Sequence, residues 1–487
     1  MRTCGILMPV SSLPSAHGIG TFGAAARDFV DFLQKANQRR WQLLPIGATG
    51  YGDSPYQSFS AFAFNPYFID LDILCADGLL TQEEIEATDM GSDAHKTDYG
   101  KLFDNRFPLL KKAAARFEKT QSYADFEAEN ATWLYDYALF MALKEENGFA
   151  AFSLWSDDIR TRRPHAIEAA QKRLAEETEF WKIVQYLCAA QWKALKAYAN
   201  ERGVQIIGDI PIYVSPDSSD LWANPQLFQL DKNGNLSEVA GCPPDGFSAD
   251  GQLWGNPLYN WALHAETGYA WWINRLKHAK SVYDIVRIDH FRGFAGYYAI
   301  PAGSDTAING RWRQGPGVPF IEAVRLKLPD IKIIAEDLGF LTDDVRSLLK
   351  HSGFPGMKVL QFAFDSREES DYLPHNYTRN CIVYTGTHDN TTTADWQLSA
   401  PQDDVANAME YLGAHGSFTK CMIRAALASV ADTAIIPMQD WLELGADARM
   451  NTPGTVSGNW QWRTTAEAFT DELAKEIARM TGLYGRN

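Results

Sequence analysis

The stretch Ile331-Lys332-Ile333-Ile334-Ala335-Glu336 is a nearly continuous apolar run that ends on a carboxylate. Such a run is typical of a parallel strand that is buried on both faces of a sheet. The stretch Thr433-Ala434-Ile435-Ile436-Pro437-Met438 has the same character. Because helical periodicity separates such runs along the chain, the sequence favours strands that alternate with helices around a parallel sheet.

Eight short apolar or β-branched runs are candidate strands. They are Gly5–Pro9, Trp41–Ile46, Val204–Ile210, Ile285–Asp289, Lys332–Glu336, Lys358–Ala363, Ile382–Thr387 and Ala434–Met438. Eight strand–helix units close into a barrel. We therefore predict an α/β fold, a (β/α)8 TIM barrel with large insertions, as a single catalytic unit over residues 1–487. The chain length alone also permits about three domains.

Uneven spacing of the candidate strands predicts two insertions. Residues 52–163, after the second strand, form a mainly helical subdomain in this interpretation, since apolar residues recur at helical steps over Trp133–Leu143. One helix over Pro164–Arg202, which ends before Gly203, then leads into the third strand. Residues 211–284 form a loop-rich subdomain with a substrate lid, because 216–260 is dense in Pro, Gly, Asn, Asp and Trp.

Composition excludes several partners. The chain has 45 Lys and Arg against 61 Asp and Glu, a net charge of −16, without a basic block that would attract nucleic acid or an anionic membrane. We expect no signal peptide, and no stretch reaches the roughly 18 apolar residues that span a bilayer. The six cysteines form no Cys-x-x-Cys pair, which predicts reduced thiols and a cytoplasmic location. No ligand set has metal-binding spacing, so we expect no metal and no cofactor.

Four acidic residues stand at or just after the ends of candidate strands: Asp209, Asp289, Glu336 and Asp389, the last preceded by His388. One such acid alone is equally well explained as a helix cap or a salt-bridge partner. Four on one rim indicate an active site, because the carboxyl ends of barrel strands carry catalysis and crowded carboxylates acquire different pKa values. Arg287 shares a strand face with Asp289 and would keep it ionised, although a structural ion pair is the alternative.

Carbohydrate chemistry is the natural substrate class for this rim. Cleavage of a glycosidic bond needs two carboxylates, and aromatic rings stack on sugar faces. Aromatic residues make up 13% of the chain and include 15 Trp. The loops 241–257 and 51–58 combine such rings with hydrogen-bonding groups.

Five motifs together resemble the amylomaltase family of 4-α-glucanotransferases, also called disproportionating enzymes, which are similar to the α-amylases in barrel and catalytic residues. The resemblance extends from Pro9 to Trp460, nearly the whole chain. The motifs are Arg287-Ile288-Asp289-His290-Phe291-Arg292-Gly293-Phe294, Ala335-Glu336-Asp337-Leu338-Gly339, Gly386-Thr387-His388-Asp389-Asn390, Asp53-Ser54-Pro55-Tyr56-Gln57-Ser58 and Asn451-Thr452-Pro453-Gly454-Thr455.

The resemblance implies a retaining transfer of an α-1,4-glucan segment to glucose or another α-glucan, through a covalent glycosyl-enzyme intermediate. It makes Asp289 the nucleophile, Glu336 the acid/base and Asp389 the transition-state stabiliser. It implies maltooligosaccharides as substrates, glucose as an acceptor and no cofactor. The implied substrate-binding residues are Arg287, His388, Ser54, Tyr56, Asp209, Asp245, Gln252, Trp254 and Asn451.

One position departs from the family pattern. Gly246 stands where relatives often carry a side chain, which predicts a more mobile loop and a poorer stacking surface for long glucans. Two other functions remain open on the residues alone: an α-glucan hydrolase, and a non-catalytic glucan-binding or regulatory barrel. The helical insertion around Trp133–Leu143 can bury its apolar face internally or against a second subunit; we favour the internal arrangement and a monomer.

Overall fold

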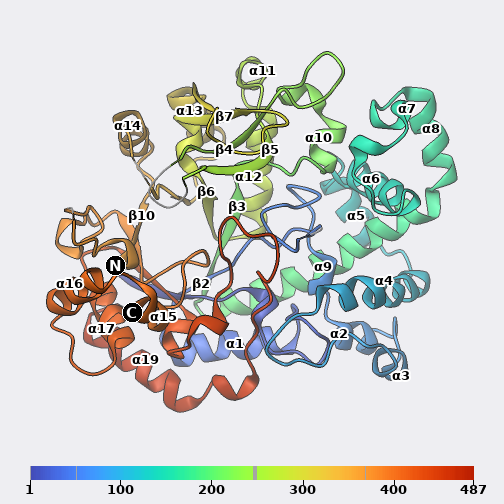
Figure 1. Ribbon diagram of the computed structural model, residues 1–487. Coiled ribbons are helices and arrows are strands. Elements are labelled where there is room, and N and C mark those ends of the chain that lie inside the picture. Colours follow the sequence, from blue (N-terminus) through green and yellow to red (C-terminus); the bar gives the residue numbers. More distant parts are fainter. Residues whose placement is uncertain (1, 51, 245–248, 340, 368, 487) are drawn as a thin grey trace.

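The computed structural model of the chain describes residues 2–50, 52–244, 249–339, 341–367 and 369–486. Its centre is a sheet of eight parallel strands in the order β10-β11-β12-β1-β2-β3-β6-β9 (Figure 1). All eight predicted strands are present, and the (β/α)8 barrel is confirmed. The strands are β1 (Thr3–Leu7), β2 (Arg40–Gln42), β3 (Gln205–Pro211), β6 (Ile285–Asp289), β9 (Ile333–Ala335), β10 (Gly356–Val359), β11 (Cys381–Tyr384) and β12 (Thr433–Pro437).

The barrel closes between β9 and β10 without a regular ladder. The Ala335 N–H donates to the Pro355 carbonyl at 3.0 Å, and the Met357 N–H donates to the Asp337 carboxylate at 2.6 Å. A side-chain oxygen therefore replaces a backbone carbonyl at this seam. A Cβ on Gly356 would lie 2.6 Å from the nearest Asp337 oxygen, so glycine permits the close approach.

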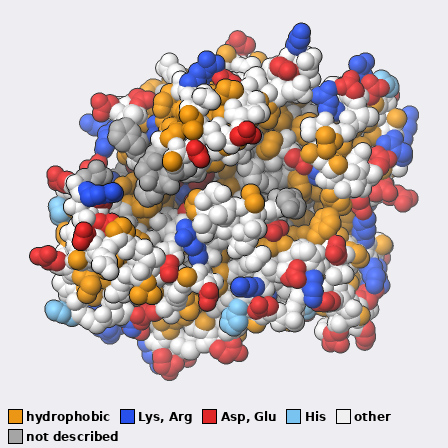
Figure 2. Space-filling view, in the orientation of Figure 1, with side chains coloured by type: hydrophobic (Ala, Val, Ile, Leu, Met, Phe, Trp, Pro, Cys, Tyr) orange, Lys and Arg blue, Asp and Glu red, His pale blue; other side chains and the backbone are white. Residues whose placement is uncertain are grey.

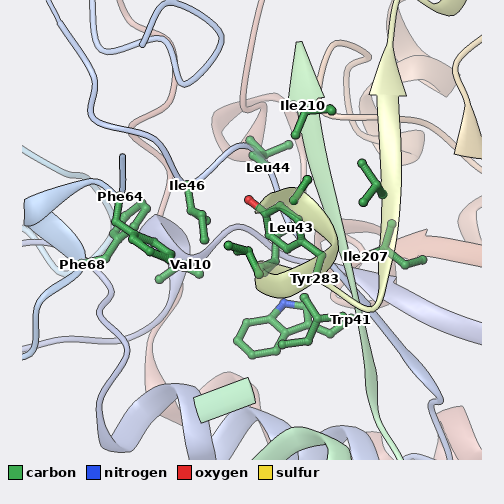
Figure 3. Close-up of a cluster of buried hydrophobic side chains, with 14 of the residues drawn as sticks. Val10, Trp41, Leu43, Leu44, Ile46, Phe64, Phe68, Ile207, Ile210 and Tyr283 are labelled. Atoms are coloured by element: carbon green, nitrogen blue, oxygen red, sulfur yellow. The ribbon is translucent and has the colours of Figure 1, made fainter. Parts of the chain in front are cut away.

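Large apolar side chains fill the space beside β2 and β3 (Figure 3). Trp41 and Leu43 lie near Ile207 and Tyr283, and all four are buried. The Trp41 indole N–H donates to the Met8 carbonyl at 2.8 Å, so this large ring is buried with its polar atom satisfied. Burying each such side chain contributes about 1.5–3 kcal/mol. This packing makes a rigid base for the residues at the strand ends.

Helices in the connections between the strands surround the sheet (Figure 1). In α1, Phe29, Val30 and Leu33 are buried, while charged residues face outward. The described part of the β10–β11 connection contains only 3-10 turns. The helices in these connections and after β12 are α1 (Ala24–Lys35), α9 (Ala175–Glu201), α12 (Ala270–Val282), α13 (Gly317–Lys327), α14 (Asp343–Ser352), α15 (Thr393–Ser399), α16 (Gln402–Leu412), α17 (Phe418–Ala428), α18 (Met438–Trp441) and α19 (Asp471–Leu483).

The segment between β2 and β3 is mainly helical and lies on the right of Figure 1. The helix expected around Trp133–Leu143 is present as α6. The single helix expected over 164–202 is wrong, because the chain breaks at the buried Leu174; apolar spacing continues on both sides of this break and hides it. The helices are α2 (Leu71–Ala76), α3 (Gln82–Glu86), α4 (Tyr99–Arg116), α5 (Gln121–Glu129), α6 (Leu134–Glu146), α7 (Asp157–Arg160) and α8 (Pro164–Arg173).

A second, antiparallel sheet covers the upper part of the barrel in Figure 1, in the order β5-β4-β7-β8. The segment 211–284, predicted to be rich in loops, therefore also contains regular strands. Two strands of this sheet follow β3, with the short helices α10 (Ser219–Ala223) and α11 (Trp261–Glu266), and the other two follow β6. The strands are β4 (Glu238–Cys242), β5 (Gln252–Pro257), β7 (Gly296–Pro301) and β8 (Arg311–Gln314).

The outer surface mixes charges of both signs with hydrophobic side chains, and it is hollowed near the middle of the face in Figure 2. None of the helices in the described residues has the length and apolar character needed to cross a bilayer. The cysteines form no disulfide within the described residues.

Candidate active site

The four strand-end acids meet at one rim of the barrel. Asp209 lies in β3, Asp289 ends β6, Glu336 follows β9, and Asp389 lies in the loop between β11 and α15. Asp209, Glu336 and Asp389 each raise the pKa of Asp289 through their charge, so the other three carboxylates all lie within electrostatic range of Asp289. Their convergence, which the sequence predicted, makes this rim the candidate active site.

Asp289 and Glu336 lie side by side because of the strand register. Ile288 pairs with Ala335, so the next residue on each strand stands at the same level. The Glu336 N–H donates to the Ile288 carbonyl at 3.0 Å. The His290 N–H donates to the Glu336 carboxylate at 2.6 Å, and the Leu338 N–H donates to its other oxygen at 2.7 Å. Both carboxylate oxygens of Glu336 are therefore held by backbone donors.

His290 turns the chain at this point. Its φ of 53° is in the left-handed region, which follows directly on the extended backbone of β6. This turn aims its N–H at Glu336. Burial lowers the pKa of the His290 imidazole to about 3, so the ring is neutral at physiological pH.

Arg287 joins two of the carboxylates. Its Nη1 lies 2.5 Å from Asp209 Oδ2 and 3.1 Å from Asp289 Oδ1. The Asp209 side chain has no exposed surface, whereas 27% of the Asp289 side chain is exposed. The Tyr56 hydroxyl donates to the same Asp209 oxygen at 2.8 Å. Asp209 thus lies beneath the rim, and Asp289 faces the solvent.

The charges at the rim do not balance. Burial raises the pKa of Asp289, which Arg287 opposes, and burial also raises the pKa of Glu336. Asp289 and Glu336 therefore retain a proton to higher pH than isolated carboxyl groups do. This is the electrostatic condition for one acid and one ionised carboxylate in the same site.

Asp389 is the most exposed member of the group, with 46% of its side chain accessible. The Asn451 side-chain amide donates to Asp389 Oδ1 at 2.7 Å. The ring of His388 lies 3.4 Å from Asp389 Oδ2, and the Arg449 guanidinium donates to the Asp389 carbonyl at 2.9 Å. These contacts orient the carboxylate while leaving it open to a ligand.

Aromatic rings line the rim. The rings of Tyr56 and His388 stack, with centroids 5.1 Å apart and planes 18° apart. Burial lowers the pKa of His388, which favours a neutral imidazole. Trp460 lies against both rings, at 5.8 Å from Tyr56 and 6.0 Å from His388. The loops of three separate connections therefore meet over the carboxylates.

The other predicted binding residues fall into three groups. Trp254 of β5 meets the His290 ring edge-on at 4.7 Å, and its indole N–H donates to Gln252 at 3.0 Å. The Ser54 hydroxyl oxygen accepts the Tyr56 N–H at 3.3 Å. Asp245, like Gly246, lies outside the described residues.

Sequence reasoning missed the backbone donors of His290 and Leu338, which hold Glu336. Both stand inside the quoted motifs, but only the backbone turn, which side-chain identity does not reveal, makes them donors. Reasoning from strand ends also missed Asp440, a buried acid in α18 that contacts the Asp389 loop. Its signal was available, because Asp440 stands shortly after β12, as Asp389 stands shortly after β11.

The sequence matches the 4-alpha-glucanotransferase family over residues 8–468. The chain belongs to this family. It is 47% identical to the 4-alpha-glucanotransferase of Clostridium butyricum over 98% of this chain and 100% of that protein. It is 46% identical to the Thermus thermophilus 4-alpha-glucanotransferase over 98% of each. Family membership makes this protein an enzyme, a glucanotransferase that acts on α-1,4-glucans, and it confirms the resemblance inferred from the motifs.

Solved structures of two amylomaltases have the same fold as this chain. The amylomaltase from Streptococcus agalactiae in complex with acarbose superimposes with a TM-score of 0.97 at 42% identity, over 100% of both chains. The amylomaltase from Corynebacterium glutamicum, at 18% identity and a TM-score of 0.79, shares the fold over 100% of this glucanotransferase and 75% of that chain.

Proposed function

We propose that this glucanotransferase transfers an α-1,4-glucan segment by double displacement, with Asp289 as nucleophile and Glu336 as acid/base. The register of β6 and β9 carries this proposal, because it sets the two carboxylates side by side. Neighbouring strands lie about 4.8 Å apart. Retaining enzymes need about 5–5.5 Å between their carboxyl groups, and residues at one level on adjacent strands are close enough to allow such a separation.

The first step forms the intermediate. The Asp289 carboxylate attacks the anomeric carbon, the bond from that carbon to the O4 atom of the next sugar breaks, and the Glu336 proton passes to O4. In the second step the acceptor hydroxyl gives its proton to Glu336 and attacks the anomeric carbon, which releases Asp289. One glucosidic bond breaks and one forms, and both carboxyl groups return to their starting states.

Asp389 supports the oxocarbenium-like transition state in this proposal. Its exposed oxygens, oriented by Asn451, face the place where positive charge develops. Arg287 favours the ionised form of Asp289, and Asp209 acts by orienting Arg287 rather than by touching sugar, because its side chain is fully buried. Ser54, Tyr56, Gln252, Trp254, His388 and Asn451, together with Asp245, are the proposed glucan contacts.

The proposed substrates are maltooligosaccharides, with glucose or a second glucan as acceptor. The acarbose complex of the Streptococcus agalactiae amylomaltase supports an oligosaccharide site in this fold. The rings of Tyr56, Trp254 and Trp460 would exclude water from the intermediate and hold a sugar acceptor. We also propose a cytoplasmic monomer without a cofactor, on the basis of cysteines that form no disulfide in the described residues and a net charge of −16.

Incubation with maltotriose alone tests transfer against hydrolysis. We expect glucose and longer maltooligosaccharides to form while the concentration of reducing ends stays constant, because transfer conserves glucosidic bonds. Chromatography gives the products, and a reducing-end assay gives net hydrolysis. Asp289→Ala should abolish product formation. A rise in reducing ends equal to bond turnover would instead make the protein an α-glucan hydrolase, and the absence of any product would favour a non-catalytic glucan-binding barrel.

A further inference from the structure

We propose that Asp440 is a positioning residue that holds the 385–393 loop, and with it Asp389, in the reactive position. The inference rests on the proposed role of Asp389 as transition-state stabiliser. Asp440 lies in α18, directly after β12, and only 1% of its surface is exposed. It contacts neither Asp289 nor Glu336 among its hydrogen bonds in the described structure.

One carboxylate ties both ends of the loop. The Thr385 hydroxyl, directly after β11, donates to Asp440 Oδ2 at 2.5 Å. The Thr393 hydroxyl, on the first residue of α15, donates to the same oxygen at 2.7 Å. The Thr393 N–H donates to Asp440 Oδ1 at 2.8 Å. Asp389 lies between these two anchors, so their separation sets the path of the chain that carries it.

The loop is held from the opposite side as well. Gln361, which follows β10, donates its side-chain amide to the Thr391 carbonyl at 2.9 Å and its N–H to the Thr385 carbonyl at 3.2 Å. Gln361, after β10, and Asp440, after β12, therefore both form hydrogen bonds to the loop that follows β11. Within the loop, the Thr387 N–H donates to the Asn390 side chain at 2.9 Å, which tightens the turn before Asp389.

A purely structural role as a helix cap does not explain these contacts. The N-cap of α15 is Thr392, whose side chain accepts the Asp395 N–H, so the helix already has its capping group. The bond from Thr385 reaches the other end of the loop, which no helix start requires. Burial raises the pKa of the Asp440 carboxyl, and hydrogen bonds from both threonines oppose this shift. Burying a carboxylate costs free energy even when it has three hydrogen-bond donors, which argues that the conformation of this loop matters to function.

The test compares Asp440→Ala with the conservative Asp440→Asn. Alanine removes the acceptor of all three donors, and we expect kcat for maltotriose disproportionation to fall at least about tenfold while KM changes less than about twofold. Asparagine retains an oxygen for the Thr393 N–H, and its amide can donate to the two hydroxyls. We therefore expect it to restore kcat to within about threefold of the wild type. A kcat for Asp440→Ala equal to that of the wild type, at equal folded fraction, would overturn the proposal.

A double-mutant cycle with Asp389 separates this proposal from the proposed function. If Asp440 acts through Asp389, adding Asp440→Ala to Asp389→Ala should reduce kcat by less than about twofold more. An equal further loss in that background would overturn the positioning role. A normal kcat for Asp389→Ala alone would instead remove Asp389 from the mechanism. The proposed role of Asp389 would then be wrong, and so would the inference about Asp440 that rests on it.

Asp70→Ala is the matched control. Asp70 is also buried and accepts one threonine hydroxyl, from Thr21 at 2.6 Å, and one N–H, from Ile73 at 3.0 Å, but it begins α2 in the helical insertion. It should lower the melting temperature without lowering kcat. Should Asp440→Ala not accumulate as folded protein, Thr385→Val enters the same cycle, since it removes one anchor and keeps the volume. A normal kcat for this variant would then overturn the proposal.

Discussion

At the scale of single residues, Arg287 decides where protons reside in the site. It contacts Asp209 and Asp289 directly, and none of its hydrogen bonds reaches Glu336. Contact with a guanidinium favours the ionised form of a carboxyl group. Arg287 also lowers the pKa of Glu336 through its charge, but without direct contact. We therefore propose that Glu336 carries the proton that a general acid needs.

Replacement of Glu336 by glutamine tests this assignment. With α-maltotriosyl fluoride, whose leaving group needs no protonation, Glu336→Gln should still form the glycosyl-enzyme, but its breakdown should be slowed about a hundredfold or more by loss of the base. Azide, a nucleophile that needs no base, should restore turnover and yield an α-glycosyl azide, measured by mass spectrometry. Asp289→Asn is the control and should form no intermediate. Absence of azide rescue would move the acid/base role to another residue.

The residues of the site were predictable to different degrees. Asp289 and Glu336 were found because a carboxylate that ends an apolar run is visible in the sequence. The backbone donor of His290 was not, because its left-handed φ depends on the packing around β6. Asp440 was hidden in another way: the acid is visible, but its partners Thr385 and Thr393 come from a different connection.

At the scale of elements, the hairpin of β4 and β5 brings Trp254 to the rim. The ring packs edge-on against His290, whose N–H holds Glu336. It therefore joins the second sheet to the residue that holds Glu336, the proposed acid/base. Its neighbour Leu253 points to the opposite face of the strand and is 39% exposed.

Removal of the Trp254 ring should change the fate of the intermediate. We expect Trp254→Ala to lower the ratio of transfer to hydrolysis about fivefold to tenfold, because water gains access and the acceptor loses a contact. The ratio is measured from maltotriose products and reducing ends, together with the melting temperature. Leu253→Ala, the control, should leave the ratio unchanged. A lower melting temperature with an unchanged ratio in Trp254→Ala would make this residue a packing anchor.

The barrel elements were predictable, and the second sheet was not. Buried parallel strands are continuous apolar runs, as in β9 and β12, so their pattern is strong even in a short segment. By contrast, β4 contains glycine and cysteine, and β8 is polar and largely exposed. These strands form because each pairs with a neighbour, and pairing across distant segments leaves little trace in either one.

At the scale of the whole molecule, buried histidines make stability depend on pH. His264 has no exposed surface and packs against the rings of Tyr259 and Trp261, both at 5.3 Å. Burial lowers its pKa to about 4. Between pH 6.5 and about 4, the unfolded chain binds a proton here and the folded chain does not. This contribution to the free energy of unfolding is therefore present above pH 6.5 and falls as the pH is lowered.

Acidification should thus destabilise the wild type more than His264→Phe, which keeps an aromatic ring and cannot titrate. From pH 7 to pH 5 the difference should be at most about 2 kcal/mol, at about 1.4 kcal/mol per pH unit below 6.5. Urea unfolding at both pH values gives the two free energies. Comparison with the variant cancels the opposing effect of acids such as Asp220, whose pKa burial raises to about 6. Equal losses in both proteins would show that His264 is protonated in the folded state.

The antiparallel sheet also limits how the fold can be rearranged. Strands β4 and β5 come from the connection after β3, whereas β7 and β8 come from the connection after β6, and β4 pairs with both β5 and β7. Neither hairpin alone would be stable, since an isolated two-stranded ribbon is marginal in water. A chimera that imports one of these connections from another barrel must therefore import both. The modular unit of this enzyme is the pair of connections that follow β3 and β6, although strand β6 separates them in the sequence.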